Sequence, residues 1–428
     1  MNILVYRYGS ICEPDVIQAF QSLGLTVLEE TTEITTKKLS SADRLKLVEA
    51  VLEKEQLLFV FSINFYPVLA EICHIYKTRY LCWTVDSPVP ELFSKSVCRD
   101  TNHLFLFDRA QYQFFAPYNP GHIHYLPLAS CTRRFDRATA SISAAQRKSY
   151  STDISFVGSL YSEKNPLHQI KGLPDSAKGY IDALTEAALK VYGYNPIESA
   201  VTDELAAAVK ACDPDFYHLE DPVVNPDRYI TAHSYIGMQA AETERIHTLN
   251  TLARHFPVDL FTRSDTRSLK NVHVHGSVES LTEMPRIFHL SKINLNMTIK
   301  PIQTGLPLRV FDILGCGGFL MTNYQAELQE YFEIGVDLEA YSSLDELADK
   351  CAYYLSHEEE RKQIALNGYR KVCEQCWKLS CHRRASILMY SRDLSRIICN
   401  PSSNCPKGSF WVMNCPGSIL FPARRCNT

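Results

Sequence analysis

The sequence predicts an α/β protein with two doubly wound domains, and three observations support this prediction. Short apolar runs alternate with helix-like segments from the N-terminus to about residue 140. The alternation resumes in the second half, where a mostly helical stretch interrupts it at about 165–240. Gly305–Tyr324 then has the pattern of a loop, a helix, a glycine stop and a strand, which is one unit of a parallel sheet. We therefore expect domains at 1–140 and 141–375, the second with a helical insertion.

In the first domain, the predicted strands are short apolar runs and the predicted helices have one apolar face. Leu57–Ile63 is apolar almost throughout, as expected of a central parallel strand that is buried on both faces. Ser41 is the candidate N-cap of the helix before it. The expected strands are 2–8, 25–28, 57–63, 80–85, 103–107 and 123–128, and the expected helices are 14–23, 41–52, 67–77 and 109–115.

The second domain is expected to follow a linker, because residues 132–152 are polar and rich in Ser, Ala and Arg. The insertion either shapes a binding cleft or is a structural cap. The expected strands are 153–158, 258–262, 272–275, 293–299, 319–322 and 338–341. The expected helices are 177–192, 201–212, a segment from 229, then 243–254, 284–290, 326–332, 344–355 and 358–372.

Composition sets the class of protein. The 428 residues are 46% hydrophobic and 21% charged, which is ordinary for a globular protein in water. The formal net charge of −4 argues against bulk binding of nucleic acid or of an anionic membrane. The sequence has no apolar run of about 20 residues, as a membrane span requires, and no signal peptide. Fifteen cysteines without a signal peptide predict free, mostly buried thiols and a cytoplasmic location.

The clearest chemical signal is the pair Arg309 and Asp312 at the start of the helix in Gly305–Tyr324. A helix N-terminus favours anions, and an arginine there has the geometry to bind a phosphate group. Asp312, one helical turn on, can accept hydrogen bonds from the vicinal hydroxyls of a ribose. The alternative is an ion pair between the two side chains without a ligand.

This segment resembles the G-x-P-x-R-x-F-[ED]-x-x-x-x-G-G frame of the group 1 glycosyltransferases of GT-B fold, in particular the bacterial CgeB/YkvP spore-maturation type. The resemblance implies two Rossmann-like domains facing a cleft, and a nucleotide-sugar donor, UDP-linked, bound without a metal ion. Asp312 matches the acidic residue that binds the donor ribose, and Gly305 and Leu308 belong to the same frame. Thr304 stands where many members have a second Glu near the sugar, so sugar recognition by that route is in doubt.

A second part of the resemblance begins with the strand at Asp153. In the family, this strand is followed by a G-[RS]-L turn and by a lysine that contacts the donor diphosphate. Gly158 and Lys164 match, and Ser159 stands where many members have Arg. The equivalent of Gly276 lies by the nucleotide base. The alternative for Lys164 is a solvated loop lysine.

In the first domain, polar residues follow the predicted strands at the edge where open α/β sheets bind ligands. Asp86 is the candidate catalytic or acceptor-binding carboxylate, with Asn64 and Arg109 as neighbours. The alternative is an Asx turn before Pro88. The WTVDSP and FDR segments resemble the N-terminal domain of CgeB-type proteins, where the acceptor is expected to bind. A dinucleotide site is not indicated, because no glycine-rich loop follows the first strand.

The last part of the chain, 376–428, differs from the rest in being rich in Cys, Pro and Ser. Cys373 and Cys376, with Cys381 and His382, suggest zinc, but the later cysteines form no second C-x-x-C pair. We therefore expect no metal site here, and an altered ending is one hypothesis for the final thirty or so residues. His273 and His275 share one face of a strand without a third ligand nearby in the sequence.

The predicted function is a glycosyltransferase of the hexosyltransferase type, without a cofactor, acting on a glycan, protein or small-molecule acceptor. The alternatives are a non-catalytic protein of the same fold that binds a nucleotide-sugar or glycan in spore or cell-surface assembly, or another GT-B chemistry such as an epimerase or a phosphorylase. Candidate catalytic residues are Asp86, Arg309 and Lys164. Candidate donor-binding residues are Asp312, Gly158, Ser159, Gly276, Thr304, Gly305 and Leu308, and the candidate acceptor-side residues are Asn64 and Arg109.

Overall fold

The computed structural model describes residues 1–37 and 39–389 of the chain, with side chains as far as residue 374. The chain divides into two units, Met1–Trp377 and Lys378–Thr428. The first unit contains two six-stranded sheets, and in both of them the described strands run parallel to their neighbours. The fold is therefore α/β with two doubly wound sheets, the architecture of a GT-B protein, as the sequence predicts.

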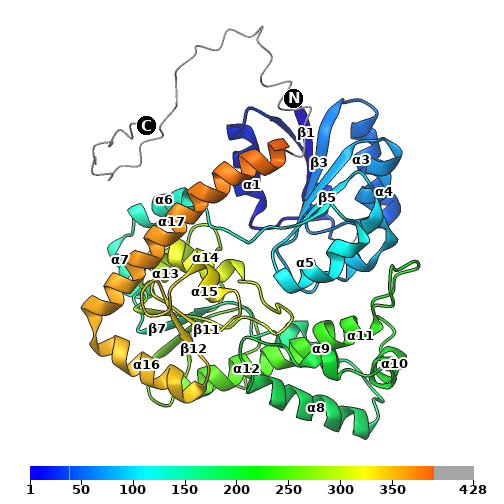
Figure 1. Ribbon diagram of the computed structural model, residues 1–428. Helices are drawn as coiled ribbons and strands as arrows, with labels where there is room; N and C mark the ends of the chain where they lie inside the picture. The colour runs from blue at the N-terminus through cyan, green and yellow to red at the C-terminus, as the bar shows by residue number, and fades with distance from the viewer. Residues whose placement is uncertain (38, 390–428) are drawn as a thin grey trace, which may run out of the picture. The chain divides into compact units, whose positions relative to one another are not determined.

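The first sheet is built from the N-terminal part of the chain (Figure 1). Its strands are β1 (Asn2–Tyr6), β2 (Thr26–Glu30), β3 (Leu57–Ile63), β4 (Arg79–Trp83), β5 (Asn102–Leu106) and β6 (Ile123–Tyr125). Its helices are α1 (Glu13–Ser22), α2 (Thr32–Thr35), α3 (Ser41–Leu52), α4 (Pro67–Ile75) and α5 (Arg109–Phe115), with the short turns η1 (Pro90–Phe93), η2 (Lys95–Cys98) and η3 (Ala116–Tyr118). The strand order is β2-β1-β3-β4-β5-β6, so it reverses between β1 and β3.

The alternation of side chains along β3 explains why this strand is apolar on both faces. Phe59 and Phe61 point to one face, where their ring centroids lie 5.5 and 5.2 Å from that of Phe20 in α1. Val60 points to the other face and packs in one buried cluster with Val48 of α3 and with residues of α4. Helices therefore cover both faces of the sheet, which requires a strand without a polar side.

The second sheet follows the same plan. Its strands are β7 (Ile154–Val157), β8 (Val258–Phe261), β9 (His273–Val274), β10 (Ile293–Asn296), β11 (Leu320–Asn323) and β12 (Glu339–Tyr341). Its helices are α12 (Gly237–Leu252), α13 (Met284–Leu290), α14 (Leu308–Gly315), α15 (Leu328–Tyr331), α16 (Leu344–Ser356) and α17 (Glu358–Met389). The order β12-β11-β10-β7-β8-β9 reverses between β7 and β10. Ligands of open α/β sheets bind at the carboxyl ends of strands at such a reversal.

The predicted helical insertion is present between β7 and α12. It consists of η4 (Ser162–Lys164), η5 (Pro166–His168), α8 (Asp175–Leu189), α9 (Ile197–Ala200), α10 (Asp203–Cys212), α11 (Asp227–Ile230) and the π-helical turn η6 (Thr231–Ile236). These elements bury a hydrophobic cluster of their own, which includes Ile181, Val209 and Ile230. The insertion is therefore a packed substructure.

The predicted linker contains two helices, α6 (Thr132–Ala140) and α7 (Ala144–Tyr150). In α6, Phe135 is 1% exposed, and Arg134 forms an ion pair with Asp15. A capping box between Ser143 and Gln146 starts α7. The sequence analysis did not predict α6 and α7, because one buried aromatic residue and a capping box do not produce a repeating apolar pattern. Their Ala, Arg and Gln residues do favour a helix.

Two helix boundaries also differ from the prediction. Ser40, and not Ser41, is the N-cap of α3, since its hydroxyl accepts a hydrogen bond from the backbone N–H of Asp43 at 3.1 Å. The last helix continues beyond Val372 to Met389. The side chains of the proposed zinc pattern after Cys373, and all residues from 390 on, lie outside the described part of the chain.

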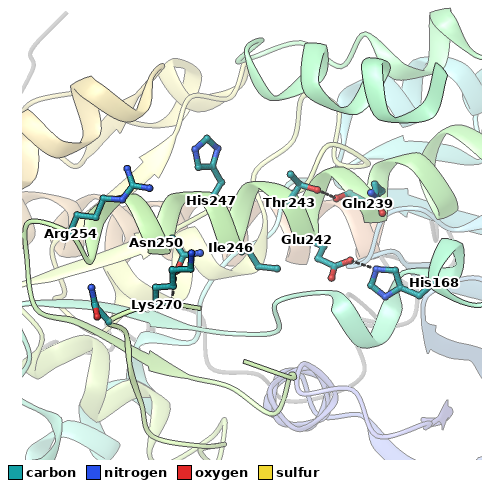
Figure 2. A pocket seen from close by; sticks show the side chains of 10 residues that line it. His168, Gln239, Glu242, Thr243, Ile246, His247, Asn250, Arg254 and Lys270 are labelled. Atoms are coloured by element: carbon teal, nitrogen blue, oxygen red, sulfur yellow. Dashed lines mark hydrogen bonds and ion pairs between the residues drawn. The ribbon is translucent and has the colours of Figure 1, made fainter. Parts of the chain in front are cut away.

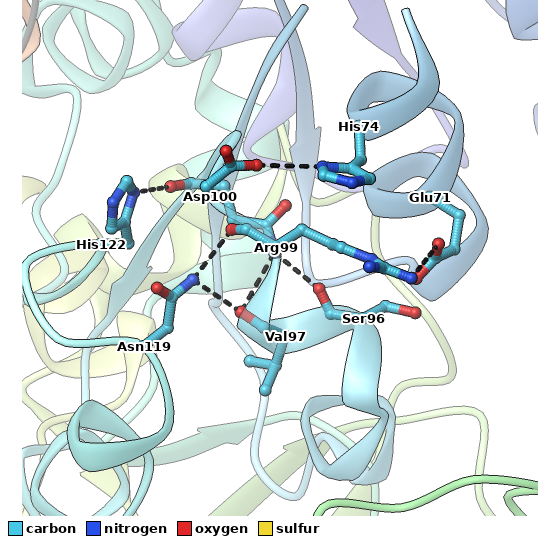
Figure 3. Close-up of polar contacts among 9 residues, drawn as sticks. Glu71, His74, Ser96, Val97, Arg99, Asp100, Asn119 and His122 are labelled. Atoms are coloured by element: carbon cyan, nitrogen blue, oxygen red, sulfur yellow. Dashed lines mark hydrogen bonds and ion pairs between the residues drawn. The ribbon is translucent and has the colours of Figure 1, made fainter. Parts of the chain in front are cut away.

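A network of polar contacts fixes the segment of η2 against α4 (Figure 3). Arg99 donates to both carboxylate oxygens of Glu71, at 3.0 and 2.8 Å. His74 pairs with Asp100 at 3.0 Å, and Asn119 donates to the backbone oxygen of Arg99 at 2.9 Å. These contacts hold the segment that leads from η2 to the start of β5.

Among the described residues, no helix is both long and apolar enough to cross a membrane. The nine cysteines in the part of the chain with described side chains are free thiols, and five of them are buried. For these residues the expectation of free, mostly buried thiols is confirmed.

Candidate functional site

The start of α14 lies where the second sheet reverses its strand order. Pro307 is the N-cap residue and provides no side-chain hydrogen bond to the first turn, so no side chain caps the amide groups that begin at Leu308. At Gly305, a β-carbon would come within 3.0 Å of the Cα atom of Asp108. Glycine at this position thus permits a close approach between the two sheet-bearing parts of the first unit.

Arg309 and Asp312 lie one turn apart on α14, with Arg309 Nη1 at 3.7 Å from Asp312 Oδ2. The guanidinium carbon of Arg309 is 5.1 Å from the centre of the Phe288 ring. The Arg309 side chain is 26% exposed and the Asp312 side chain 5%. Burial raises the pKa of Asp312 to about 6, although Arg309 and Arg134 oppose this shift. The ion pair foreseen as the alternative is therefore present, and its carboxylate is held in a poorly solvated position.

A second arginine, which the sequence reading missed, lies at the carboxyl ends of β7 and β10. Arg245 in α12 is 9% exposed and donates hydrogen bonds to the backbone oxygens of Ser159, at 2.6 Å, and Met297, at 2.9 Å. Its guanidinium carbon is 4.4 Å from the centre of the Tyr161 ring. Burial lowers the pKa of Arg245, and the charge of Arg309 lowers it further. Arg245 is thus held by backbone oxygens that follow β7 and β10, which places a second buried cation at the carboxyl ends of these two strands.

One sequence signal could have identified Arg245. It stands four and seven residues before Leu249 and Leu252, so it lies on the apolar face of α12. A charged residue in phase with buried leucines needs a buried partner or a ligand.

The turn after β7 contains the residues predicted to contact the donor diphosphate. The backbone N–H of Gly158 donates to Phe261 O at 3.0 Å, which continues the ladder between β7 and β8. The Ser159 hydroxyl donates to Glu163 at 2.6 Å and accepts from the N–H of Tyr161 at 2.7 Å. Lys164 is exposed, and its Nζ atom lies 4.8 Å from the centre of the Tyr161 ring. Arg245 and Lys164 therefore meet at Tyr161, whereas the Ser159 hydroxyl is occupied within the turn.

Gly276 lies in an exposed turn with φ +72°, a conformation that favours glycine. His275 Nε2 is 2.6 Å from Asp259 Oδ1, and His273 Nδ1 is 3.8 Å from the same oxygen. The two imidazoles therefore share one carboxylate. No cluster of three or more metal-ligating side chains occurs among the described residues.

Thr304, at the family position for a sugar-binding Glu, lies in a buried polar network. Its Oγ1 atom is 2.9 Å from Asp108 Oδ1 and 2.7 Å from Glu327 Oε1. Its hydroxyl is thus engaged by two carboxyl groups of the protein.

In the first sheet, the structure brings Asn64 and Asp86 together with a third residue, Tyr8, that was not predicted. Asn64 Nδ2 donates to Asp86 Oδ2 at 2.7 Å and to the Tyr8 hydroxyl at 3.2 Å, and Asn64 Oδ1 accepts from Val85 N–H at 3.0 Å. Asn64 has φ +57°, which is uncommon for a residue with a side chain and is frequent at functional sites. Burial and the charge of Asp86 raise the pKa of Tyr8.

These three side chains line a pocket of about 880 Å³. Its walls come from the segment fixed by Glu71 and Arg99 and from residues 217–221 of the insertion. Many of its charges are already paired, because Arg44 binds Glu33 at 2.7 Å and Arg99 binds Glu71 at 2.8 Å. The insertion therefore closes one side of the predicted acceptor region.

Arg109 is not among the residues that line this pocket. Its guanidinium pairs with Glu330 and lies 4.5 Å from the centre of the Tyr125 ring. The structure therefore does not bring Arg109 to Asn64 and Asp86. The sequence reading placed them together because all follow strands of one sheet, but Arg109 begins α5 beyond β5, away from the reversal between β1 and β3.

A second pocket, of about 480 Å³, lies along α12 (Figure 2). His247 and Asn250 of α12 line it together with Arg254, which lies just beyond the end of the helix, and the backbone N–H of Lys270 donates to Asn250 Oδ1 at 2.7 Å. At its other end, Glu242 pairs with His168 at 3.1 Å. This pocket does not contain the predicted site residues.

Comparison with known proteins supports a glycosyl transferase-like C-terminal half. Residues 245–389, about a third of the chain, match a family described as glycosyl transferase-like. The match spans Arg245, Gly276, Thr304, Arg309 and Asp312. No curated protein matches the chain.

Solved structures with a similar fold have little sequence identity to the chain. Anabaena HepE in complex with UDP and glucose is 12% identical, covering 91% of this chain and 100% of that chain, with a TM-score of 0.49. Sucrose-phosphate synthase from Thermosynechococcus elongatus is 9% identical, covering 91% and 98%, with a TM-score of 0.49. T4 phage BGT in complex with UDP-glucose is 9% identical, covering 90% and 98%, with a TM-score of 0.47. Because the sequence identities and TM-scores are low, we base the description of the fold on the two sheets alone.

Proposed function

We propose that the protein is a glycosyltransferase that moves a sugar from a nucleotide-sugar, UDP-linked, to a hydroxyl group of an acceptor. The single observation that carries the proposal is the start of α14, where no side chain caps the helix and Arg309 lies beside the buried carboxylate of Asp312. An arginine at a helix start suits a phosphate group, and a carboxylate one helical turn away suits the two hydroxyls of a ribose. The glycosyl transferase-like match of this region supports the same assignment.

In this proposal the donor diphosphate binds between Arg309 and Arg245, with Lys164 at its exposed side. When the bond between the sugar and the phosphate breaks, negative charge grows on the diphosphate. Cations that are already in position stabilise that charge without reorganisation. These side chains supply the positive charge, and the proposal therefore includes no metal ion and no further cofactor.

Asp86 is the proposed general base on the acceptor side. Its carboxylate would accept the proton of the acceptor hydroxyl while the new bond between that oxygen and the sugar carbon forms. The hydrogen bond from Asn64 Nδ2 to Asp86 Oδ2, at 2.7 Å, holds the carboxylate at the edge of the pocket. The acceptor lies in this pocket, and the protein is of the CgeB/YkvP type.

A second candidate function is binding of a nucleotide-sugar without turnover. The observation that favours it is the position of Thr304, whose hydroxyl is engaged by Asp108 and Glu327 and so offers no carboxylate to a sugar. Release of a nucleoside diphosphate under turnover conditions would exclude this alternative.

The test is thermal unfolding with a panel of nucleoside diphosphates and nucleotide-sugars. Wild type is compared with the double variant Arg309→Ala, Asp312→Ala, and with Lys362→Ala, which removes an exposed charge from α17. A specific ligand at 100 times its Kd is expected to stabilise wild type by about 2.7 kcal/mol. The double variant should lose this shift and the control should keep it. Absence of any shift in a folded wild-type sample would contradict the proposal.

A further inference from the structure

The loop at residues 300–304, which leads from β10 towards α14, is held by side chains from several parts of the first unit. Its backbone groups are bonded one after another along the loop. The contacts are Asn195 Nδ2 to Lys300 O at 2.8 Å, Ser87 Oγ to Pro301 O at 2.7 Å, Gln325 Nε2 to Ile302 O at 3.3 Å, and the N–H groups of Gln303 and Thr304 to Asp108 at 2.6 and 3.3 Å. The first sheet, the insertion and the second sheet therefore all fix this loop.

Two buried carboxyl groups meet at the end of the loop. Asp108 is 0% exposed and Glu327 is 2% exposed. The Thr304 hydroxyl lies between them, 2.9 Å from Asp108 Oδ1 and 2.7 Å from Glu327 Oε1. It also accepts a hydrogen bond from the backbone N–H of Ala110 at 3.1 Å. The first sheet contributes Asp108 and the second contributes Glu327, so the contact joins the two.

The two carboxyl groups compete for the single hydrogen of the Thr304 hydroxyl. The Thr304 hydroxyl has one hydrogen and can donate to only one of the two carboxyl groups. The other contact is a hydrogen bond only if the second carboxyl group is protonated and donates to Thr304 Oγ1. Burial raises the pKa of Asp108, hydrogen bonds from Thr304 and Gln303 lower it, and the charge of Glu327 raises it.

The surroundings of Glu327 supply hydrogen bonds but no cation in direct contact with it among the described residues. Its Oε1 atom accepts from the backbone N–H of Arg109 at 3.0 Å, and its Oε2 atom accepts from the Tyr125 hydroxyl. The Arg109 guanidinium pairs with Glu330 instead. Burial of acidic groups without a paired cation is costly, so this cluster is a poor source of stability. We expect the cluster of Asp108, Thr304 and Glu327 to favour one conformation of the loop at 300–304.

That arrangement determines where α14 begins. Gly305 follows directly, at the close approach to Asp108, and four residues later the chain reaches Arg309. We propose that Asp108 and Glu327 are positioning residues for the donor site, which hold the loop at 300–304 and thereby place the start of α14 with Arg309. This inference rests on the proposed function, since it is that function which assigns a nucleotide to Arg309.

The test uses Glu327, because Asp108 also caps α5 through Ala110 N–H at 3.0 Å and its removal would change that helix. In Glu327→Gln, the amide oxygen can accept from Arg109 N–H and Thr304, and the amide NH2 group can donate to Tyr125. Glu327→Ala removes all three contacts. Glu330→Gln, one turn along at the exposed ion pair, is the matched control.

Nucleotide Kd and KM, kcat, melting temperature and backbone hydrogen exchange of residues 303–309 are measured for each variant. Glu327→Ala should weaken nucleotide binding about tenfold or more, with a larger change in KM than in kcat, because misplacement of a binding group impairs donor binding first. It should also speed exchange at 303–309. Glu327→Gln and the control should stay within about threefold of wild type.

A lower melting temperature in Glu327→Ala with unchanged nucleotide Kd and unchanged exchange at 303–309 would overturn the inference, since the role would then be stability alone. If wild type binds no nucleotide, the proposed function fails on its own. Hydrogen exchange needs no ligand and still decides the positioning role: faster exchange in Glu327→Ala supports it, and unchanged exchange overturns it.

Discussion

In both sheets the strand order reverses, but the side chains at the carboxyl ends of their strands differ in charge. In the first sheet, the edge next to the strand reversal carries Tyr8, Asn64 and Asp86, which are neutral or acidic. In the second sheet, the corresponding edge gathers Arg309 and Arg245. Strand order reverses in both, between β1 and β3 and between β7 and β10. The fold therefore defines two possible binding edges, and side-chain charge decides which suits an anion and which a hydroxyl group.

The two edges also differ in how their carboxylates are solvated. Asp86 is exposed and is held by Asn64. Asp312 is buried, and burial raises its pKa to about 6. An exposed carboxylate can exchange a proton with solvent after each turnover, whereas a buried one is suited to fixed hydrogen bonds. The proposed function accordingly places proton transfer at the first edge and nucleotide binding at the second.

The largest expected effect separates the roles of the two edges. Asp86→Asn should lower kcat about 10²–10⁴-fold, because the amide cannot accept a proton from the acceptor. The affinity for a nucleoside diphosphate should stay unchanged, since that ligand belongs to the other edge. Steady-state kinetics and calorimetry on the same sample measure both quantities. A kcat within tenfold of wild type would remove Asp86 from the role of base.

A smaller effect concerns Asp312 and pH. Only the ionised carboxylate accepts hydrogen bonds from both ribose hydroxyls, so nucleotide affinity should fall about tenfold from pH 7 to pH 5, as a carboxyl group with a pKa of about 6 becomes protonated. Calorimetric titration of wild type against pH measures this fall, and in Asp312→Asn it should be absent.

Stability of the free protein should respond to the same group in the opposite direction. The folded-state pKa of Asp312 is raised above the ordinary value for Asp, so its favourable contribution is present at low pH and is lost as pH rises through about 6. Comparing the pH dependence of unfolding free energy in wild type and Asp312→Asn isolates that contribution. If affinity and stability changed in the same direction with pH, Asp312 would not be the ribose ligand.

The smallest expected effect tests whether Lys164 contributes to diphosphate binding at the second edge. Lys164 is exposed and lies over Tyr161, so Lys164→Ala should weaken diphosphate binding only about two- to fivefold, as expected of a solvated charge. The difference from wild type should shrink further at high salt. Binding measured at two ionic strengths gives the result. A loss as large as that of Arg309→Ala would mean that Lys164 moves onto the ligand.

Much of the fold follows from local sequence patterns. The continuous apolar run of β3 and the glycine-terminated helix α14 are found where the sequence predicts them. The spacing of apolar residues and the positions of glycines depend on only a few neighbouring residues, so they indicate helices and strands without knowledge of tertiary contacts. The helices α6 and α7 escaped prediction because a single buried residue, Phe135, anchors the first of them.

The candidate site was less predictable, because its members come from distant parts of the chain. Arg309 and Asp312 were identified by their spacing on one helix. Arg245 was not, since its contacts with Ser159 and Met297 join residues separated by 86 and 52 positions. Tyr8 reaches Asn64 over 56 positions. No local pattern encodes such approaches.

What the sequence by itself determined about this protein is the α/β class, the order of most strands along the chain, and the placement of Arg309 and Asp312 one turn apart at the start of a helix. These depend on short-range properties: backbone propensity, apolar period and the charge of neighbouring residues. Only the tertiary structure decided that Arg245 contacts Ser159 and Met297, that Arg109 pairs with Glu330, and that Thr304 lies between two carboxyl groups. Those contacts arise when separate segments pack together, and burial then changes the charges and hydrogen bonds that each side chain can keep.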